Sequence, residues 1–259
     1  MSSFLDLPVV PFGAARFGSD GTTDHVVIEE PLEIRINSRN IAITMRTPGH
    51  DEELATGFLF TEGLIRGADQ ILSVTAAGNQ VNVQMQDCPA VAPRLTMTSA
   101  CGVCGKESID HLYAAGCKPC PSDSFSIRAA VLQGLPETLR FAQATFEQTG
   151  GLHAAGLFNS ECELKIIRED VGRHNAVDKV IGGLLRSGLK PHLHLLLVSG
   201  RASFELVQKA AMAGIPMLAA VGAPSTLAVE TAKRFNMTLA GFLRDDRFNI
   251  YTGAERILC

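Results

Sequence analysis

The sequence predicts an α/β protein in which a three-layer α/β/α domain follows a smaller α+β domain. After about Ser126, short apolar runs that suit buried strands alternate with segments of helical periodicity, which is typical of βαβ units and a largely parallel sheet. Before that point, two hairpin patterns flank one helical segment. Because the chain has 259 residues and is 46% hydrophobic, it can bury two modest cores. We therefore expect domains at residues 1–98 and 126–259, joined by a mobile, cysteine-bearing connector at 99–125.

The smaller domain is expected to contain two hairpins and a helix. Apolar runs at residues 34–36 and 41–45 flank a polar turn, which predicts the first hairpin. Apolar residues at helical spacing predict a helix over residues 51–64. Alternating apolar residues around a Gly-Asn turn predict a second hairpin over residues 73–85. These elements make a small α+β unit.

The larger domain is expected to alternate strands with helices along its whole length. The expected strands cover residues 154–158, 163–168, 193–199, 217–221, 238–243 and 248–252. The expected helices cover residues 175–185, 204–213 and 227–235, where apolar residues recur at helical spacing. Helices between successive parallel strands cover both faces of a sheet, so this pattern predicts three layers.

Composition excludes several classes of protein. The net charge is −4, and the chain has no Trp and only two Tyr, which argues against a general nucleic-acid binder. The first residues show neither a secretory signal pattern nor an apolar run long enough to span a bilayer. Seven cysteines, four of them clustered, suit reduced thiols better than a secreted disulfide framework. We therefore expect a cytoplasmic protein with no membrane contact.

The four clustered cysteines mark the segment where chemistry is expected. Cys101 and Cys104 form a CxxC pair flanked by glycines and followed by Lys106. Two such thiols can share a metal, form a disulfide or relay a sulfur atom. Cys117 and Cys120 form a second CxxC pair twelve residues further on, close to the spacing of a structural zinc site. The spacing alone leaves sulfur chemistry and zinc binding both open.

Two strand-to-helix junctions are candidates for anion binding. The junction at residues 198–203 carries Ser199 and Arg201, and a second junction at 221–226 carries glycine and hydroxyl residues. Ligands of open α/β sheets gather beyond the carboxyl ends of strands, where helix N-termini attract phosphate. The alternative for each junction is ordinary helix capping, with Pro224 at a first helical position.

Two further segments place histidines at strand ends. Residues 169–175 bring Asp170, Arg173, His174 and Asn175 together after a strand, which is too polar for a simple core and favours a site. His153 follows two glycines and precedes a strand. Its pattern is equally compatible with ligand contact and with local hydrogen bonding.

The chain resembles the FdhD family of formate dehydrogenase accessory sulfurtransferases over nearly its whole length. The resemblance lies in several segments, each of which is a weak signal by itself. In chain order they are residues 47–63 (TPGHDEELATGFLFTEG), 99–105 (SACGVCG), 149–153 (TGGLH), 169–175 (EDVGRHN), 199–203 (SGRAS) and 238–244 (TLAGFLR). Their common order makes coincidence improbable.

The resemblance implies a function, a cofactor and partners. The protein would take sulfur from a cysteine desulfurase and deliver it to the molybdenum bis(molybdopterin guanine dinucleotide) cofactor of formate dehydrogenase, acting as a cytoplasmic homodimer. The family's catalytic pair falls on Cys101 and Cys104, with a persulfide on Cys101. The family's cofactor-binding stretch falls on Phe242, Leu243, Arg244, Asp245, Asp246 and Arg247. The guanine nucleotide moieties suit the turns that carry His153, His174, Ser199 and Arg201.

The resemblance also implies a cytidine-deaminase-like fold for the second domain, without that enzyme's chemistry. Deaminases place a glutamate two residues after a zinc-binding histidine, whereas Ala155 stands two residues after His153. We expect no metal site and no permanent cofactor. The alternative is a non-enzymatic chaperone of an oxidoreductase, stabilised by zinc on Cys101, Cys104, Cys117 and Cys120.

Overall fold

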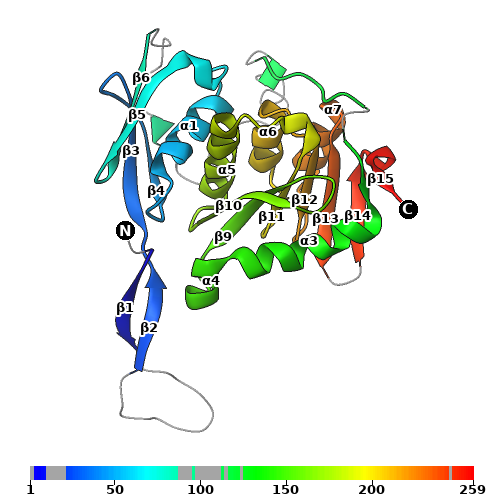
Figure 1. Ribbon diagram of the computed structural model, residues 1–259, viewed down its shortest axis with the longest axis horizontal. Helices are drawn as coiled ribbons and strands as arrows, with labels where there is room; N and C mark the ends of the chain where they lie inside the picture. Colours follow the sequence, from blue (N-terminus) through cyan, green and yellow to red (C-terminus); the bar gives the residue numbers. More distant parts are fainter. Residues whose placement is uncertain are drawn as a thin grey trace.

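The computed structural model describes residues 3–9, 22–86, 95–96, 112–113, 116–122, 125–244 and 247–259 (Figure 1). A five-stranded sheet forms in the first part of the chain and a six-stranded sheet in the second. Most of the connector expected at residues 99–125 lies outside the described residues. The predicted α/β class is confirmed.

The six-stranded sheet has the strand order β10-β9-β11-β12-β13-β14. Its strands are β9 (His153–Phe158), β10 (Leu164–Asp170), β11 (Leu195–Val198), β12 (Met217–Ala220), β13 (Thr238–Arg244) and β14 (Arg247–Thr252). Strands β10, β11, β12 and β13 point the same way, but only the β11–β12 and β12–β13 pairings are parallel, so the pairing is mixed rather than the largely parallel one that the sequence pattern predicts. At both ends of the sheet a short connection joins successive strands, and short connections permit only antiparallel pairing.

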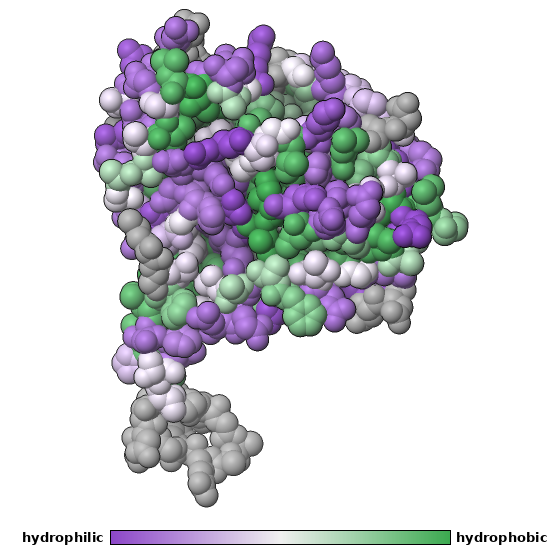
Figure 2. Space-filling view, viewed as in Figure 1, coloured by the Kyte–Doolittle hydropathy of each residue, from purple (hydrophilic) through white to green (hydrophobic). Residues whose placement is uncertain are grey.

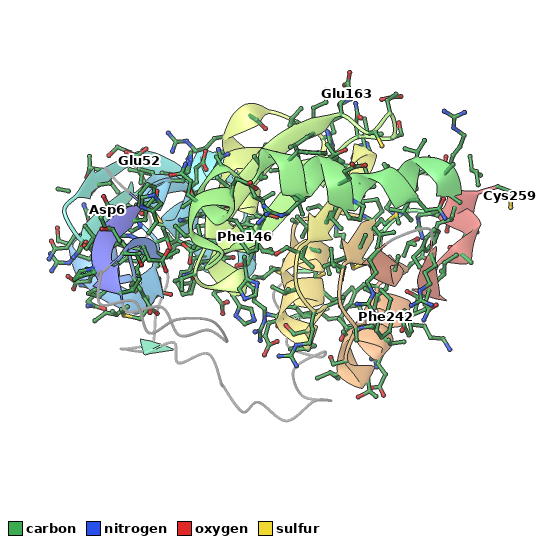
Figure 3. The ribbon with its side chains drawn as sticks, turned by 90° about the horizontal axis from the view of Figure 1, so that it is seen from below. Asp6, Glu52, Phe146, Glu163, Phe242 and Cys259 are labelled. Atoms are coloured by element: carbon green, nitrogen blue, oxygen red, sulfur yellow. The ribbon has the colours of Figure 1, made fainter. Side chains whose placement is uncertain are left out.

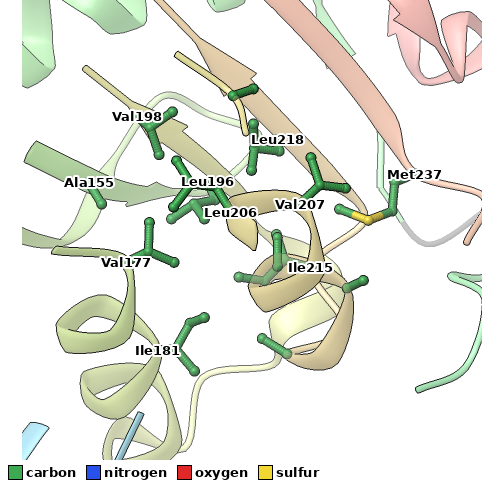
Figure 4. Close-up of a cluster of buried hydrophobic side chains, with 14 of the residues drawn as sticks. Ala155, Val177, Ile181, Leu196, Val198, Leu206, Val207, Ile215, Leu218 and Met237 are labelled. Carbon is green, nitrogen blue, oxygen red and sulfur yellow. The ribbon is translucent and has the colours of Figure 1, made fainter. Parts of the chain in front are cut away.

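Helices cover both faces of this sheet, as the three-layer prediction requires (Figure 1). One face packs against α3 (Ala129–Ala142), and the other against α5 (Arg173–Ser187), α6 (Phe204–Met212) and α7 (Thr226–Arg234). Successive residues of β11 point to opposite faces: Leu195 packs with α3, whereas Leu196 packs with α5 and α6 (Figure 4). The continuous apolar strands are therefore buried on both sides.

Two helices and several short elements were not predicted from the sequence. Helix α3 and the short α4 (Ala144–Thr149) occupy residues to which we assigned no helix. The short elements are β8 (Ile127–Arg128), β15 (Ile257–Leu258), η1 (Ala68–Gln70), η2 (Pro191–Leu193) and η3 (Ala254–Arg256). Strands β8 and β15 pair with each other in parallel.

The five-stranded sheet has the strand order β5-β6-β3-β4-β7 and packs against α1. Its elements are β3 (Glu30–Ile36), β4 (Arg39–Arg46), α1 (Asp51–Thr61), β5 (Ile71–Ala77), β6 (Gln80–Met85) and β7 (Leu95–Thr96). Both predicted hairpins are confirmed. The turn residues Asn37 and Ser38 have positive φ angles, as a tight hairpin turn requires.

Helix α1 joins this sheet to the larger one by packing against α5 (Figure 1). The two helices cross in backbone contact. A Cβ atom added to Gly57 of α1 would lie 1.9 Å from the carbonyl oxygen of Asp178, and one added to Gly182 of α5 would lie 1.9 Å from that of Glu53. The glycines allow this close approach because they lack a side chain.

A hairpin of β1 (Phe4–Val9) and β2 (Thr22–Val27) extends away from the body of the molecule (Figure 1). On the face viewed in Figure 2, hydrophilic side chains interleave with smaller groups of apolar ones. Among the described residues, no helix combines the length and the apolar character that crossing a membrane needs.

Candidate functional site

The carboxyl ends of β10, β11, β12 and β13 meet at one edge of the large sheet (Figure 3, viewed from the side of this edge). Strand β9 runs in the opposite direction, so its first residue also lies there. His153 of β9 pairs with Asp170, the last residue of β10. On its other side, β9 pairs with β11, which Ser199 follows directly. The topology thus brings His153, Ser199 and the 170–175 segment together, because β9 runs opposite to its neighbours.

The two junctions at residues 198–203 and 221–226 lie against each other. The amide of Gly222 donates to the carbonyl oxygen of Gly200 at 2.9 Å, and the amide of Ala202 donates to that of Ala223 at 3.1 Å. A Cβ atom on Gly222 would lie 3.1 Å from Cγ of Arg201, so glycine lets the two turns pack closely. Both junctions contribute to one surface.

Ser199 and His153 form the centre of this surface. The hydroxyl of Ser199 accepts a hydrogen bond from the amide of Ala154 at 2.9 Å, which fixes the serine beside the start of β9. A Cβ atom on Gly200 would lie 3.4 Å from Nδ1 of His153, so the imidazole lies next to this turn. Burial lowers the pKa of His153 below its ordinary value, and the charge of Arg173 lowers it further. The imidazole is therefore mainly neutral at pH 7.

Several polar atoms at the N-termini of α5 and α6 lack partners. Within the described part of the chain, Nε of Arg173, Nε2 of His174 and Oγ of Ser203 are buried without a hydrogen bond. Nε2 of His174 lies 3.8 Å from a carboxylate oxygen of Glu205. Interaction with His174 is the main cause that lowers the pKa of Glu205 to about 2, and the hydroxyl of Ser203 contributes. These groups lie beside two helix N-termini, where negative charge is favoured, and the Glu205 carboxylate already lies among them.

The other two polar residues of the 169–175 segment have a structural role. Asp170 is fully buried and forms an ion pair with Lys179, with 2.7 Å between Oδ2 and Nζ. It also accepts hydrogen bonds from the amides of Gly172 and Thr47 and from the side chain of Asn175. Asp170 and Asn175 therefore hold residues 44–47 against the large sheet and are not free to bind a ligand.

A pocket of about 650 Å³ opens at this edge. Three residues predicted from the sequence line it, namely His153, Ser199 and Arg244. The opposite wall comes from α3 and α4 and includes Gln143 and Phe146, which sequence reasoning missed because it placed no helix there. The spacing of the apolar residues Leu132, Leu135 and Leu139 was the available signal for α3.

The predicted cofactor-binding stretch lies at a distorted end of β13. Phe242 has a φ of 54°, in the left-handed region, where the β13–β14 register shifts. Such a conformation costs about 1–3 kcal/mol and is commonest at functional sites. Leu243 is completely buried in the core, so only its backbone is available to a ligand. Arg244 and Arg247 are exposed and face each other across the two strands, whereas Asp245 and Asp246 lie outside the described residues.

The predicted catalytic cysteines, Cys101 and Cys104, also lie outside the described residues. Cys117 and Cys120 are described as free, buried thiols. Burial and the neighbouring Cys120 raise the pKa of Cys117 to about 12, and burial raises the pKa of Cys120. Among the residues that can be described, no cluster of three or more His, Cys, Asp or Glu side chains is arranged to hold a metal ion.

Comparison with known proteins identifies close relatives. The model of the FdhD/NarQ family matches residues 27–258. A protein of Streptomyces avermitilis named "Sulfur carrier protein FdhD" is 50% identical, with 90% of this chain and 89% of that protein aligned. A protein of the same name from Corynebacterium efficiens is 48% identical over 98% of both chains. The crystal structure of a Desulfotalea psychrophila protein, described as a candidate formate dehydrogenase accessory protein, superposes with a TM-score of 0.83 at 29% identity, covering 99% of this chain and 100% of that one.

Proposed function

Because the chain belongs to the FdhD/NarQ family, we propose that it is a sulfurtransferase that serves the maturation of formate dehydrogenase. It accepts persulfide sulfur from a cysteine desulfurase on Cys101. It then transfers that sulfur to the molybdenum bis(molybdopterin guanine dinucleotide) cofactor, which it binds as a substrate. The proposal includes a homodimer that acts in the cytoplasm.

Loading is a thiol–persulfide exchange. The Cys101 thiolate attacks the terminal sulfur of the donor persulfide and forms a new S–S bond. The S–S bond of the donor breaks, and its electron pair leaves with the donor thiolate, so the step needs no external oxidant or reductant. The neighbouring Lys106 would favour the thiolate form that this attack requires.

Release of the sulfur requires two electrons, and Cys104 supplies them. Its thiolate attacks the inner sulfur of the Cys101 persulfide, which forms a Cys101–Cys104 disulfide and expels hydrosulfide toward the molybdenum. A cellular dithiol then reduces the disulfide and restores both thiols. The CxxC spacing suits this step because the two cysteines can form a disulfide with each other.

The observation that supports the cofactor part of the proposal is the pocket at the carboxyl edge of the large sheet. Its volume of about 650 Å³ suits a nucleotide-sized group. Arg244 lines this pocket, Arg173 is the first residue of α5, and Arg201 lies in the adjoining 198–203 junction. These cations suit the phosphates of a guanine nucleotide, although the chain as a whole carries a net charge of −4.

Mass spectrometry of the intact protein tests the sulfur relay. After incubation with a cysteine desulfurase and cysteine, the chain is expected to gain the mass of sulfur, and Cys101→Ser is expected to abolish the gain. The matched control is Cys259→Ser, because Cys259 is an exposed cysteine far along the chain from the CxxC pair. Sulfur loading of Cys101→Ser at the level of the unaltered protein would contradict the proposal.

The zinc-stabilised chaperone remains a prediction, since two of its four cysteines lie outside the described residues. Elemental analysis of the purified protein tests it directly. A content of one zinc ion per chain that is lost in each of the single variants Cys101→Ser and Cys117→Ser would favour the chaperone. Zinc-free protein that still accepts sulfur would favour the relay.

A further inference from the structure

Gln143 is a buried polar residue with an unpaired side-chain atom in the described part of the chain. It connects α3 to α4 and is 4% exposed. Its Nε2 atom is buried without a hydrogen-bond partner among the described residues. A buried amide nitrogen without an acceptor is unfavourable, and it calls for an explanation in a folded protein.

Helix capping does not explain this side chain. The first free amides of α4, those of Thr145 and Phe146, donate to the carboxylate of Glu169 at 3.0 and 2.8 Å. The backbone of Gln143 is itself used, since its amide donates to Arg140 and its carbonyl oxygen accepts from Glu147. Only Nε2 of the carboxamide is left without an acceptor among the described residues, so an acceptor must come from elsewhere.

Gln143 is one of the residues that line the pocket at the carboxyl edge. In the same pocket, Leu139, Phe146, Leu152 and Val221 supply apolar walls. Arg140 and Arg244 supply positive charge, and Glu137 supplies one negative charge. A flat heteroaromatic ring fits such walls, and a phosphate joined to the ring suits the cations. A precisely placed polar group between apolar walls commonly fixes the orientation of a ligand and selects among related ligands.

We propose that Gln143 is a specificity-determining residue that donates a hydrogen bond from Nε2 to the carbonyl oxygen at position 6 of guanine. The inference rests on the proposed function, because the guanine belongs to the cofactor named there. Adenine carries an amino group at position 6, which cannot accept this hydrogen bond. A site built around a buried donor rejects a ligand that leaves the donor unpaired.

Isothermal titration calorimetry with GDP tests the contact. The variant Gln143→Leu is expected to bind GDP about tenfold more weakly than the unaltered protein, the loss of one hydrogen bond. The matched control is Gln148→Leu, an exposed glutamine of the adjoining helix α4, which is expected to keep full affinity. Equal GDP affinity in Gln143→Leu and the unaltered protein would overturn the inference.

Two further ligands test the selectivity. ADP is expected to bind the unaltered protein more weakly than GDP, and Gln143→Leu is expected to bring the two affinities together. Neopterin carries a carbonyl and amino edge like that of guanine but no phosphate. Tighter binding of neopterin than of GDP would assign the pocket to a pterin ring and overturn the guanine contact.

Thermal unfolding separates this role from a structural one. Since the carboxamide is unpaired, Gln143→Leu is expected to keep or raise the Tm while it weakens GDP binding. A lower Tm together with unchanged GDP affinity would show that the side chain serves the fold. If the unaltered protein loads sulfur but binds no GDP, the relay stands while the cofactor contact and this inference both fail.

Discussion

At the scale of single residues, the pKa of His153 reports the electrostatics of the candidate site. Burial is the main cause of its lowered pKa, and the charge of Arg173 is the next. A proton NMR titration is expected to give His153 a midpoint below 6.5, and Arg173→Gln is expected to raise that midpoint. In the folded state the neutral imidazole resists protonation, so this residue favours unfolding as the pH falls below 6.5. A midpoint above 6.5 would contradict the burial described for this side chain.

Sequence reasoning identified those site residues whose amino-acid type is unusual at their place in the sequence pattern. His153, Ser199 and Arg244 were predicted, and they line one pocket. Gln143 was not predicted, because a glutamine after a helix is ordinary and only the packing around it shows that its amide is unpaired. Leu243 was assigned to a binding stretch by resemblance, yet its side chain lies in the core. A motif does not show which side chains of a strand face inward.

At the scale of elements, the crossing of α1 and α5 predicts that one added methyl group strongly destabilises the protein. A Cβ at position 57 would overlap the carbonyl oxygen of Asp178, so Gly57→Ala must push the helices apart. Overpacking typically lowers the free energy of unfolding by about 1–3 kcal/mol. We expect at least the upper value because the added methyl group meets backbone atoms, which are rigid. Urea unfolding measures the effect.

The chain provides a matched control for this substitution. Gly134 lies inside α3, and a Cβ there would meet nothing within 4 Å. Gly134→Ala is therefore expected to stabilise the protein by about 0.5–1 kcal/mol, because alanine is the better helix former. A loss of stability in Gly57→Ala no larger than about 1 kcal/mol would show that the helices separate easily.

Elements with strong local periodicity were predicted well, and those set by distant contacts were not. The β11-α6-β12-α7-β13 units follow from alternating apolar strands and helices. Helix α3 was missed, although its leucines follow helical spacing, because Gly134 and Pro136 interrupt the pattern. The direction of β9 was also missed. It depends on β10 pairing back onto β9 through a short connection, and an apolar run does not show strand direction.

At the scale of the whole molecule, buried polar contacts hold the two sheets in a fixed relation. Thr47 donates its amide to Asp170 and accepts from Lys179 through its carbonyl oxygen. Such contacts help to specify one arrangement, because any other arrangement leaves a buried charge unpaired. The same contacts of Thr47 with Asp170 and Lys179 also hold in place the strand ends that carry the candidate site.

A second buried cluster joins α6, α5 and the end of α1, and it gives the molecule a predictable response to alkali. Nζ of Lys209 lies 2.9 Å from Asp178 and 3.2 Å from Glu62. Burial alone would lower the pKa of Lys209, but the two carboxylates outweigh it and raise the pKa above 10.5. The stabilisation is therefore complete below pH 10.5 and is lost as the pH rises through the folded-state pKa.

The variant Lys209→Met removes this stabilisation and leaves Asp178 buried without its cation. We expect this to lower the free energy of unfolding by about 3–5 kcal/mol near pH 7. The difference in Tm between the unaltered protein and Lys209→Met should stay constant from pH 7 to 9 and shrink above about pH 10.5, the ordinary pKa of lysine. The double variant Lys209→Met/Asp178→Leu is the control, since replacing both charges with apolar groups is often neutral. A Tm difference that persists unchanged through the alkaline range would show that Lys209 acts through packing rather than through its charge.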